Sequence, residues 1–163
     1  MMKKFLLGII LGLISLSLVS QEISTYYLIR HAEKEVIADR NPNLTSIGEL
    51  RAQAWAEIFR DIKFDAVYST DYKRTKATAK PTALKNNLDL ILYHPRNINI
   101  EKFKEETKGK TVLIVGHSNT IPNFVNQLIE QKKYPNIEDD NNGNLYIVEL
   151  GEHFKTDQLL HFK

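Results

Sequence analysis

The chain has 163 residues, of which 22 are Lys or Arg, 20 are Asp or Glu and none is Cys. The absence of cysteine excludes disulfides, thiolate zinc sites and a cysteine nucleophile. Residues 1–20 hold two lysines and no acid, so without them the formal charge falls from +2 to about zero. This balance gives no reason to expect binding to nucleic acid.

The N-terminal segment has the pattern of a targeting sequence. Two lysines precede an uninterrupted run of apolar, Gly and Ser residues from Phe5 to Val19, and the small Ser20 follows it. This run is short for a membrane span and is typical of a secretory signal peptide. We therefore expect a signal peptide over residues 1–20 and one domain over 21–163, in a periplasmic or secreted protein. The large Leu18 leaves an uncleaved, N-terminally membrane-anchored protein as the alternative.

Beyond residue 20, predicted strands and helices alternate along the chain. Runs rich in β-branched and aliphatic residues predict strands near 25–29, 66–69, 90–93, 111–115, 144–149 and 155–161. Helical patterns predict helices that begin near Thr45 or Ser46 and near Tyr72, a helix over 98–107, and one after 111–115 with Pro122 in its first turn. This alternation predicts a single three-layer α/β/α domain with a central, mostly parallel sheet.

Three local patterns refine the first two helices. Ser46 and Glu49 are spaced as a capping box at the start of the first helix. Lys80-Pro81 predicts a kink or an interruption in the second helix, because proline lacks the N–H of the helical hydrogen bond. The first helix is also expected to bury an apolar stripe. This stripe consists of Leu50, Ala54, Trp55, Ile58 and Phe59.

Two of the predicted strands each end in a histidine. The first leads into Arg30-His31, and the strand near 111–115 leads into Gly116-His117. Residues just past the carboxyl ends of strands line the ligand crevice of an open α/β sheet. We therefore expect the two imidazoles to lie at one edge of the sheet. The other histidines, His94, His153 and His161, lack such a setting and are expected to be structural or to face solvent.

Four motifs occur in the order typical of the histidine phosphatase superfamily, which is also named after phosphoglycerate mutase. They are Arg30-His31-Ala32 followed by Glu33, Leu44-Thr45-Ser46-Ile47-Gly48, the segment from Ser69 through Arg74-Thr75 to Thr78-Ala79, and Val115-Gly116-His117-Ser118. The resemblance covers roughly residues 25–149 and implies a phosphoglycerate mutase-like fold. The one departure in the first motif is Ala32, where the family usually has glycine.

The resemblance implies a role for each matching residue. His31 would be the nucleophile that forms a phosphohistidine, and His117 would lie beside it and donate to the same phosphate when protonated. Arg30 and Arg74 would bind the phosphate, for which guanidinium is suited because it presents a planar fork of donors and keeps its charge. Two cations beside the imidazoles would repel a divalent ion, so no metal and no cofactor are expected.

A general acid is harder to assign from the sequence. Alkyl phosphates need a proton on the departing oxygen, and some relatives place an aspartate after the second histidine, where this chain has Ser118. Glu33 is the first candidate acid or base because it lies two residues past His31. The alternative for Glu33 is a carboxylate at the rim of the pocket or an ion pair with Lys34 or Arg51. Asp39 and Glu101 are weaker candidates.

The function implied is that of a phosphatase hydrolysing phosphomonoesters through a phosphohistidine on His31. Its partner would be a small phosphorylated substrate, with no nucleic acid and no stable membrane insertion if the signal is cleaved. Two alternatives stay open: a phosphatase for phosphohistidine or other activated phosphoryl groups, and a non-catalytic phosphate-binding module. The short chain shows no insertion that would cap a phosphoglycerate pocket, which counts against a mutase.

Overall fold

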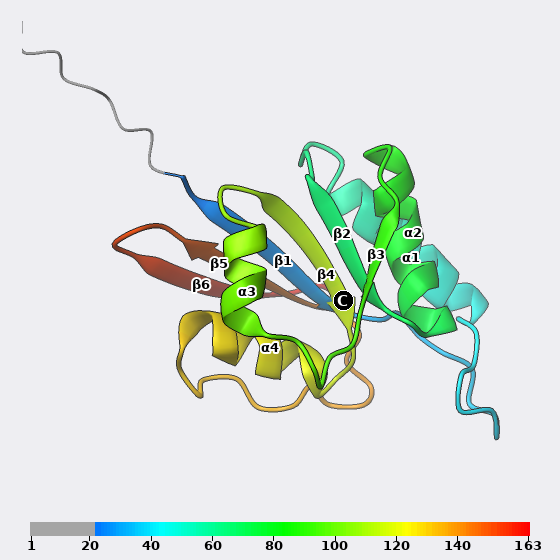
Figure 1. The fold of residues 1–163 in the computed structure, drawn as a ribbon. Coiled ribbons are helices and arrows are strands. Elements are labelled where there is room, and N and C mark those ends of the chain that lie inside the picture. The colour runs from blue at the N-terminus through cyan, green and yellow to red at the C-terminus, as the bar shows by residue number, and fades with distance from the viewer. Residues whose placement is uncertain (1–21) are drawn as a thin grey trace, which may run out of the picture.

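The computed structural model describes residues 22–163, and the predicted signal peptide lies outside these residues. The described chain alternates between strands and helices (Figure 1). In chain order the elements are β1 (Ser24–Arg30), α1 (Ser46–Ile58), β2 (Ala66–Thr70), α2 (Lys73–Lys85), β3 (Leu90–Tyr93), α3 (Ile100–Glu106), β4 (Thr111–Gly116), α4 (Thr120–Ile129), β5 (Asn144–Leu150) and β6 (Lys155–His161).

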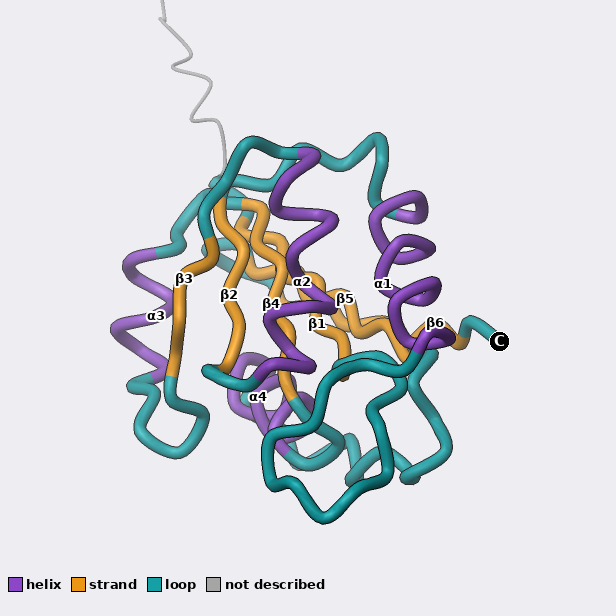
Figure 2. Tube along the Cα trace, turned by 90° about the vertical axis from the view of Figure 1, so that its right-hand side faces the viewer, coloured by secondary structure: helices purple, strands orange, loops and turns teal. Residues whose placement is uncertain are grey.

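All six strands form one sheet in the order β3-β2-β4-β1-β5-β6. The first four strands of this order run parallel, whereas β5 pairs with β1 and with β6 in antiparallel register. Helices α1 and α2 cover one face and α3 and α4 cover the other, which gives three layers (Figures 1 and 2). The prediction of an α/β/α domain with a mostly parallel sheet is confirmed.

The alternation of side chains along the central strands builds a core on each face. Tyr26 and Leu28 of β1 pack with Phe103 of α3 and Leu128 of α4 on one face. Ile29 packs on the other face, against the aromatic side chains of α1 and the alanines of α2. Because β1 and β4 are covered on both faces, they read as continuous apolar runs rather than as alternating ones.

The first helix begins as expected, but its cap and its buried stripe differ from the prediction. Thr45 is the N-cap, and its hydroxyl accepts from the N–H of Gly48 at 3.1 Å, so the predicted capping box from Ser46 is wrong by one residue. The side chains buried in α1 are those of Ala52, Trp55 and Ala56, with Phe59 just after it. Leu50 is 71% exposed and Ile58 is 40% exposed, because the stripe that faces the sheet is shifted around the helix.

Two further helix predictions are corrected. The predicted interruption at Lys80-Pro81 does not occur, since helix α2 continues past Pro81 to Lys85, whereas the alternative of a kink stays a prediction. Ala79 and Ala83, on either side of the proline, are buried against the sheet, and this packing offsets the loss of one hydrogen bond. Helix α3 is shorter than expected and begins after the N-cap Asn99, whose side chain accepts from Lys102 N–H. Among residues 22–163, no helix is both long and apolar enough to cross a membrane.

Candidate active site

A cleft of about 930 Å³ opens at the carboxyl ends of the parallel strands. Figure 2 shows these strand ends at the lower end of the sheet. Arg30 ends β1 and His31 follows it, Thr70 ends β2, and His117 comes directly after β4. Arg74 reaches the cleft from the first turn of α2. The structure therefore brings together the two histidines and the two arginines that the sequence predicts, from segments far apart in the chain.

His31 is held with one ring nitrogen bound to the main chain. Its Nδ1 lies 2.8 Å from the carbonyl oxygen of Ala32, which can only accept, so Nδ1 carries the hydrogen and Nε2 keeps a lone pair. The side chain is nearly fully buried. This burial lowers the pKa of His31 to about 3, with smaller contributions from the charges of Arg30, His117 and Arg74. His31 is therefore neutral at physiological pH, which is the form of imidazole that can act as a nucleophile.

His117 is oriented by a chain of hydroxyl groups. The hydroxyl of Thr75 donates to the main-chain carbonyls of Thr70 and Tyr72, at 2.8 and 3.0 Å. Because its one hydrogen is used in this way, its oxygen accepts from the hydroxyl of Thr70 at 3.0 Å. The Thr70 oxygen then accepts from Nε2 of His117 at 2.9 Å. The lone pair of Nδ1 is left toward Arg74, whose Nη2 lies 3.4 Å away.

The electrostatic setting of His117 disfavours its charged form in the empty cleft. Burial, followed by the charges of Arg74 and Arg30, lowers the pKa of His117 to about 4. The ring of His117 lies edge-on to that of His31 at a centroid distance of 5.5 Å. A Cβ on Gly116, just before it, would lie 2.9 Å from the side-chain ends of Tyr93, Thr120 and Ile121, so a larger residue would require these side chains to shift.

The two arginines offer hydrogen-bond donors that have no partner among the described residues. The guanidinium of Arg74 stacks on the ring of Tyr72, 4.5 Å from its centroid. Both Nε and Nη1 of Arg74 are buried without a partner, and so is Nε of Arg30. Buried unpaired donors are costly, and an oxyanion in the cleft would satisfy several of them at once. The arrangement is suited to binding a group with several charged oxygens, such as phosphate.

Hydrogen bonds join the loop between α4 and β5 to Arg30 and His31 of the first histidine motif. Nη1 of Arg30 donates to the carbonyls of Glu138, Asp139 and Asn141 at 2.8 to 3.0 Å. The side chain of Asn142 donates to the carbonyl of His31 at 2.8 Å. Sequence reasoning predicts a loop at residues 139–143 but missed its contacts with the site, because these residues lie more than a hundred positions from Arg30 and carry no motif.

The three carboxylates predicted as acids lie outside the cleft lining. Glu33 pairs with Nε of Arg51 at 2.7 Å, which is one of the alternatives that the sequence left open. Asp39 lies 3.9 Å from Lys73. Glu101 belongs to α3, on another part of the molecule. The carboxylates that do line the cleft, among the described residues, are Asp71 and Asp139. His94, expected to be structural or exposed, also lines it.

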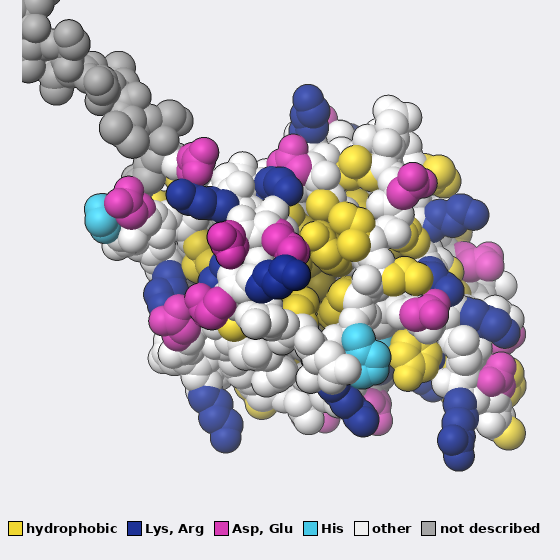
Figure 3. All heavy atoms as spheres, viewed as in Figure 1, with side chains coloured by type: hydrophobic (Ala, Val, Ile, Leu, Met, Phe, Trp, Pro, Cys, Tyr) yellow, Lys and Arg dark blue, Asp and Glu magenta, His cyan; other side chains and the backbone are white. Residues whose placement is uncertain are grey.

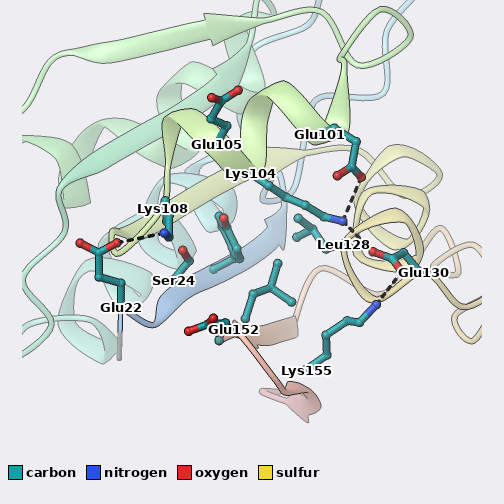
Figure 4. Close-up of a pocket in the computed structure, with 13 residues that line it drawn as sticks. Glu22, Ser24, Glu101, Lys104, Glu105, Lys108, Leu128, Glu130, Glu152 and Lys155 are labelled. Atoms are coloured by element: carbon teal, nitrogen blue, oxygen red, sulfur yellow. Dashed lines mark hydrogen bonds and ion pairs between the residues drawn. The ribbon is translucent and has the colours of Figure 1, made fainter. Parts of the chain in front are cut away.

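Glu101 lines a second hollow of about 760 Å³ near the start of β1. In Figure 4, Lys104 lies between Glu101 and Glu130, and Lys155 also reaches Glu130. Figure 3 likewise shows acidic and basic side chains next to one another over α3. The lysines of this hollow are paired with its acids and no histidine lines it, so the cleft at the other end of β1 is the candidate active site.

Within residues 22–163, no group of three or more His, Cys, Asp or Glu side chains is placed to hold a metal ion.

Part of the sequence resembles a known protein family. Residues 26–94 match the model of the histidine phosphatase superfamily (branch 1). This match covers less than half of the chain, and the fold as a whole is phosphoglycerate mutase-like. A comparison with curated protein sequences finds no match.

Several solved structures have a similar fold. Phosphoglycerate mutase from Bacillus anthracis superposes with a TM-score of 0.69 at 14% identity, covering 86% of this chain and 93% of that chain. The protein histidine phosphatase SixA complexed with tungstate gives 0.68 at 15% identity, covering 84% and 96%. A mycobacterial glucosyl-3-phosphoglycerate phosphatase complexed with VO3 gives 0.65 at 11%, covering 86% and 99%. At these identities the likeness concerns the fold.

Proposed function

We propose that this protein is a phosphatase that hydrolyses phosphomonoesters through a phosphohistidine intermediate on His31. The observation that carries this proposal is the pairing of a neutral imidazole, with its Nε2 lone pair free, and three guanidinium donors without partners. A pure binding site needs the guanidinium groups but has no use for a nucleophile among them. The pairing therefore favours catalysis over a non-catalytic phosphate-binding module.

In the first step, Nε2 of His31 attacks phosphorus and the bond from phosphorus to the ester oxygen breaks. The electron pair of that bond leaves with the oxygen, and Nδ1 keeps its hydrogen, which is bound to the carbonyl of Ala32. Arg74 and Arg30 stabilise the charge on the equatorial oxygens of the phosphoryl group, which is the main requirement of phosphoryl transfer. His117 contributes a further donor once a bound phosphate has raised its pKa.

The second candidate function is a phosphatase for substrates with good leaving groups, and the ion pairs of the nearby carboxylates favour it. Glu33 is bound to Arg51, and Asp71 is bound to Lys76 at 2.6 Å, so neither is free to protonate a departing alkoxide. Aryl phosphates and phosphorylated nitrogen atoms need little or no such help. A phosphatase for activated phosphoryl groups, such as phosphohistidine, therefore remains the alternative, and one of the solved structures with a similar fold is a protein histidine phosphatase.

The proposal is tested by replacing the nucleophile. His31→Ala should abolish hydrolysis of nitrophenyl phosphate and should remove an acid-labile, base-stable phosphoryl label that the unmodified protein acquires during turnover. His153→Ala is the matched control, because His153 is exposed on the turn between β5 and β6, and its activity should be unchanged. Substantial turnover by folded His31→Ala protein would contradict the covalent mechanism.

A further inference from the structure

We propose that Asp139 is the base that accepts a proton from the water that hydrolyses the phosphohistidine. This inference rests on the phosphatase function proposed above and adds a residue for its second step. It begins from the loop between α4 and β5, which contributes Asp139 to the lining of the cleft. This loop belongs to none of the four sequence motifs.

The loop is held against the two residues that handle the phosphoryl group. Three carbonyls of residues 138–141 accept from a single nitrogen of Arg30, and Asn142 donates to the carbonyl of His31. A turn within the loop is closed by the N–H of Asn141, which donates to the carbonyl of Glu138 at 3.0 Å. The position of Asp139 relative to His31 is therefore fixed by main-chain contacts and does not depend on its own side chain.

The side chain of Asp139 lies beside a guanidinium that the proposed function assigns to phosphate binding. Its Oδ1 lies 3.8 Å from Nη2 of Arg30, while the side chain as a whole is fully exposed. A carboxylate at this position can accept a proton from a water molecule that lies between it and phosphorus, which is the role of a general base.

The other carboxylates near the cleft are engaged elsewhere. Asp71 also lines the cleft, but it is bound to Lys76 on the outer side of α2. Glu33 is bound to Arg51. Asp139 instead pairs with Arg30, the arginine of the cleft that the proposed function assigns to phosphate binding. This contact distinguishes Asp139 from Asp71 and Glu33.

The proposed step balances without a further co-reactant. The oxygen of water forms a bond to phosphorus while the bond from phosphorus to Nε2 of His31 breaks, and its electron pair returns to Nε2. One proton of the water passes to the carboxylate of Asp139, which releases it to solvent after inorganic phosphate leaves. His31 is then neutral again with its hydrogen on Nδ1, so the departing imidazole needs no acid.

The test separates the two chemical steps. Asp139→Asn should form the phosphoenzyme from nitrophenyl phosphate at close to the normal rate, seen as a burst of nitrophenol. Its phosphoenzyme should then decay about 10²-fold more slowly, the usual lower scale for loss of a general base. Asp140→Asn is the matched control, since it removes the same charge from the next residue of the loop, which does not line the cleft. This control should keep both rates, and Asp139→Glu should recover part of the decay rate.

The outcomes distinguish this inference from the proposed function. If the unmodified protein forms a phosphoenzyme on His31 and Asp139→Asn hydrolyses it equally fast, the role of Asp139 is wrong and the phosphatase mechanism stands. If Asp139→Asn and Asp140→Asn slow the decay equally, the effect is one of net charge and the inference is also wrong. If the unmodified protein forms no phosphoenzyme, both proposals fail.

Discussion

His117 donates through Nε2 to the hydroxyl of Thr70, at 2.9 Å across the ends of two neighbouring strands. Thr70 ends β2 and His117 follows β4, so the parallel pairing of these strands sets the distance between them. The hydroxyl of Thr70 is in turn fixed by Thr75 at the start of α2. This chain of hydrogen bonds determines which nitrogen of His117 is left to face Arg74.

Replacing Thr70 tests whether this orientation matters. Thr70→Val keeps the shape of the side chain but removes the acceptor, so the ring of His117 can turn or exchange its hydrogen between nitrogens. We expect kcat for nitrophenyl phosphate to fall by up to about 10²-fold, as for other small misplacements of catalytic groups. Thr70→Ser, which keeps the hydroxyl, should stay near normal. Equal activity of the two variants would show that the hydrogen bond does not position His117.

Arg74 should be needed for both binding and turnover. Arg74→Ala removes two of the three unpaired donors in the cleft, so aryl phosphate hydrolysis should fall by about 10²-fold or more. Vanadate should also bind more weakly, measured as its inhibition constant. Arg60→Ala is the control, because Arg60 is an exposed arginine paired with its neighbour Asp61. A normal inhibition constant in Arg74→Ala would place Arg74 outside the anion site.

The histidines should make the stability of the empty protein depend on pH. Their pKa values are lowered to about 3 for His31 and about 4 for His117, whereas an unfolded histidine has a pKa of about 6.5. Between pH 6.5 and about 4, the unfolded chain therefore binds protons that the folded chain does not. The free energy of unfolding should decrease as the pH falls through this window, by at most about 1.4 kcal/mol per pH unit for each histidine.

Urea unfolding at a series of pH values measures this effect. His117→Gln should flatten the pH profile between pH 6.5 and 4, since it removes one of the two groups. Bound phosphate should also flatten it, because a phosphate dianion favours the charged form of His117 and raises its pKa. If the pH profiles of the unmodified protein and of His117→Gln run parallel, His117 is not responsible for the pH dependence.

The sequence predicted the parts of the molecule that depend on local pattern. Continuous apolar runs placed β1 and β4, and the residues after them placed His31 and His117 at one sheet edge. The motif from Ser69 to Ala79 likewise placed Arg74. These predictions succeeded because the carboxyl ends of parallel strands meet at one edge, whatever the details of the packing.

What the sequence could not predict depends on contacts between distant residues. The N-cap of α1 is Thr45 rather than Ser46 because the main chain of Thr45 is already bound to Glu33 at 2.9 Å. Asp139 reaches the cleft because of its contact with Arg30, 109 residues away. Closeness in sequence favoured Glu33 as the acid, but the ion pair with Arg51 directs its carboxylate elsewhere.

Gly48 lies where α1 contacts the segment after His31, and we expect any larger residue at this position to destabilise the protein. A Cβ built on Gly48 would lie 2.1 Å from the carbonyl oxygen of Glu33, far inside van der Waals contact. Replacing glycine by alanine within a helix usually stabilises a protein by about 0.5–1 kcal/mol. Here the main chain of Glu33 would have to move, so we expect Gly48→Ala to lower the free energy of unfolding by about 1–3 kcal/mol, the usual cost of overpacking.

A matched variant separates this clash from helix propensity. Ala54→Gly at an exposed position of the same helix should cost about 1 kcal/mol by propensity alone. The two opposite exchanges should therefore both destabilise the protein, which propensity cannot explain. Because Glu33 follows His31 by two residues, Gly48→Ala should also slow formation of the phosphoenzyme, whereas Ala54→Gly should leave it unchanged. A Gly48→Ala protein that is more stable in urea would show that α1 and the Glu33 segment can separate without cost.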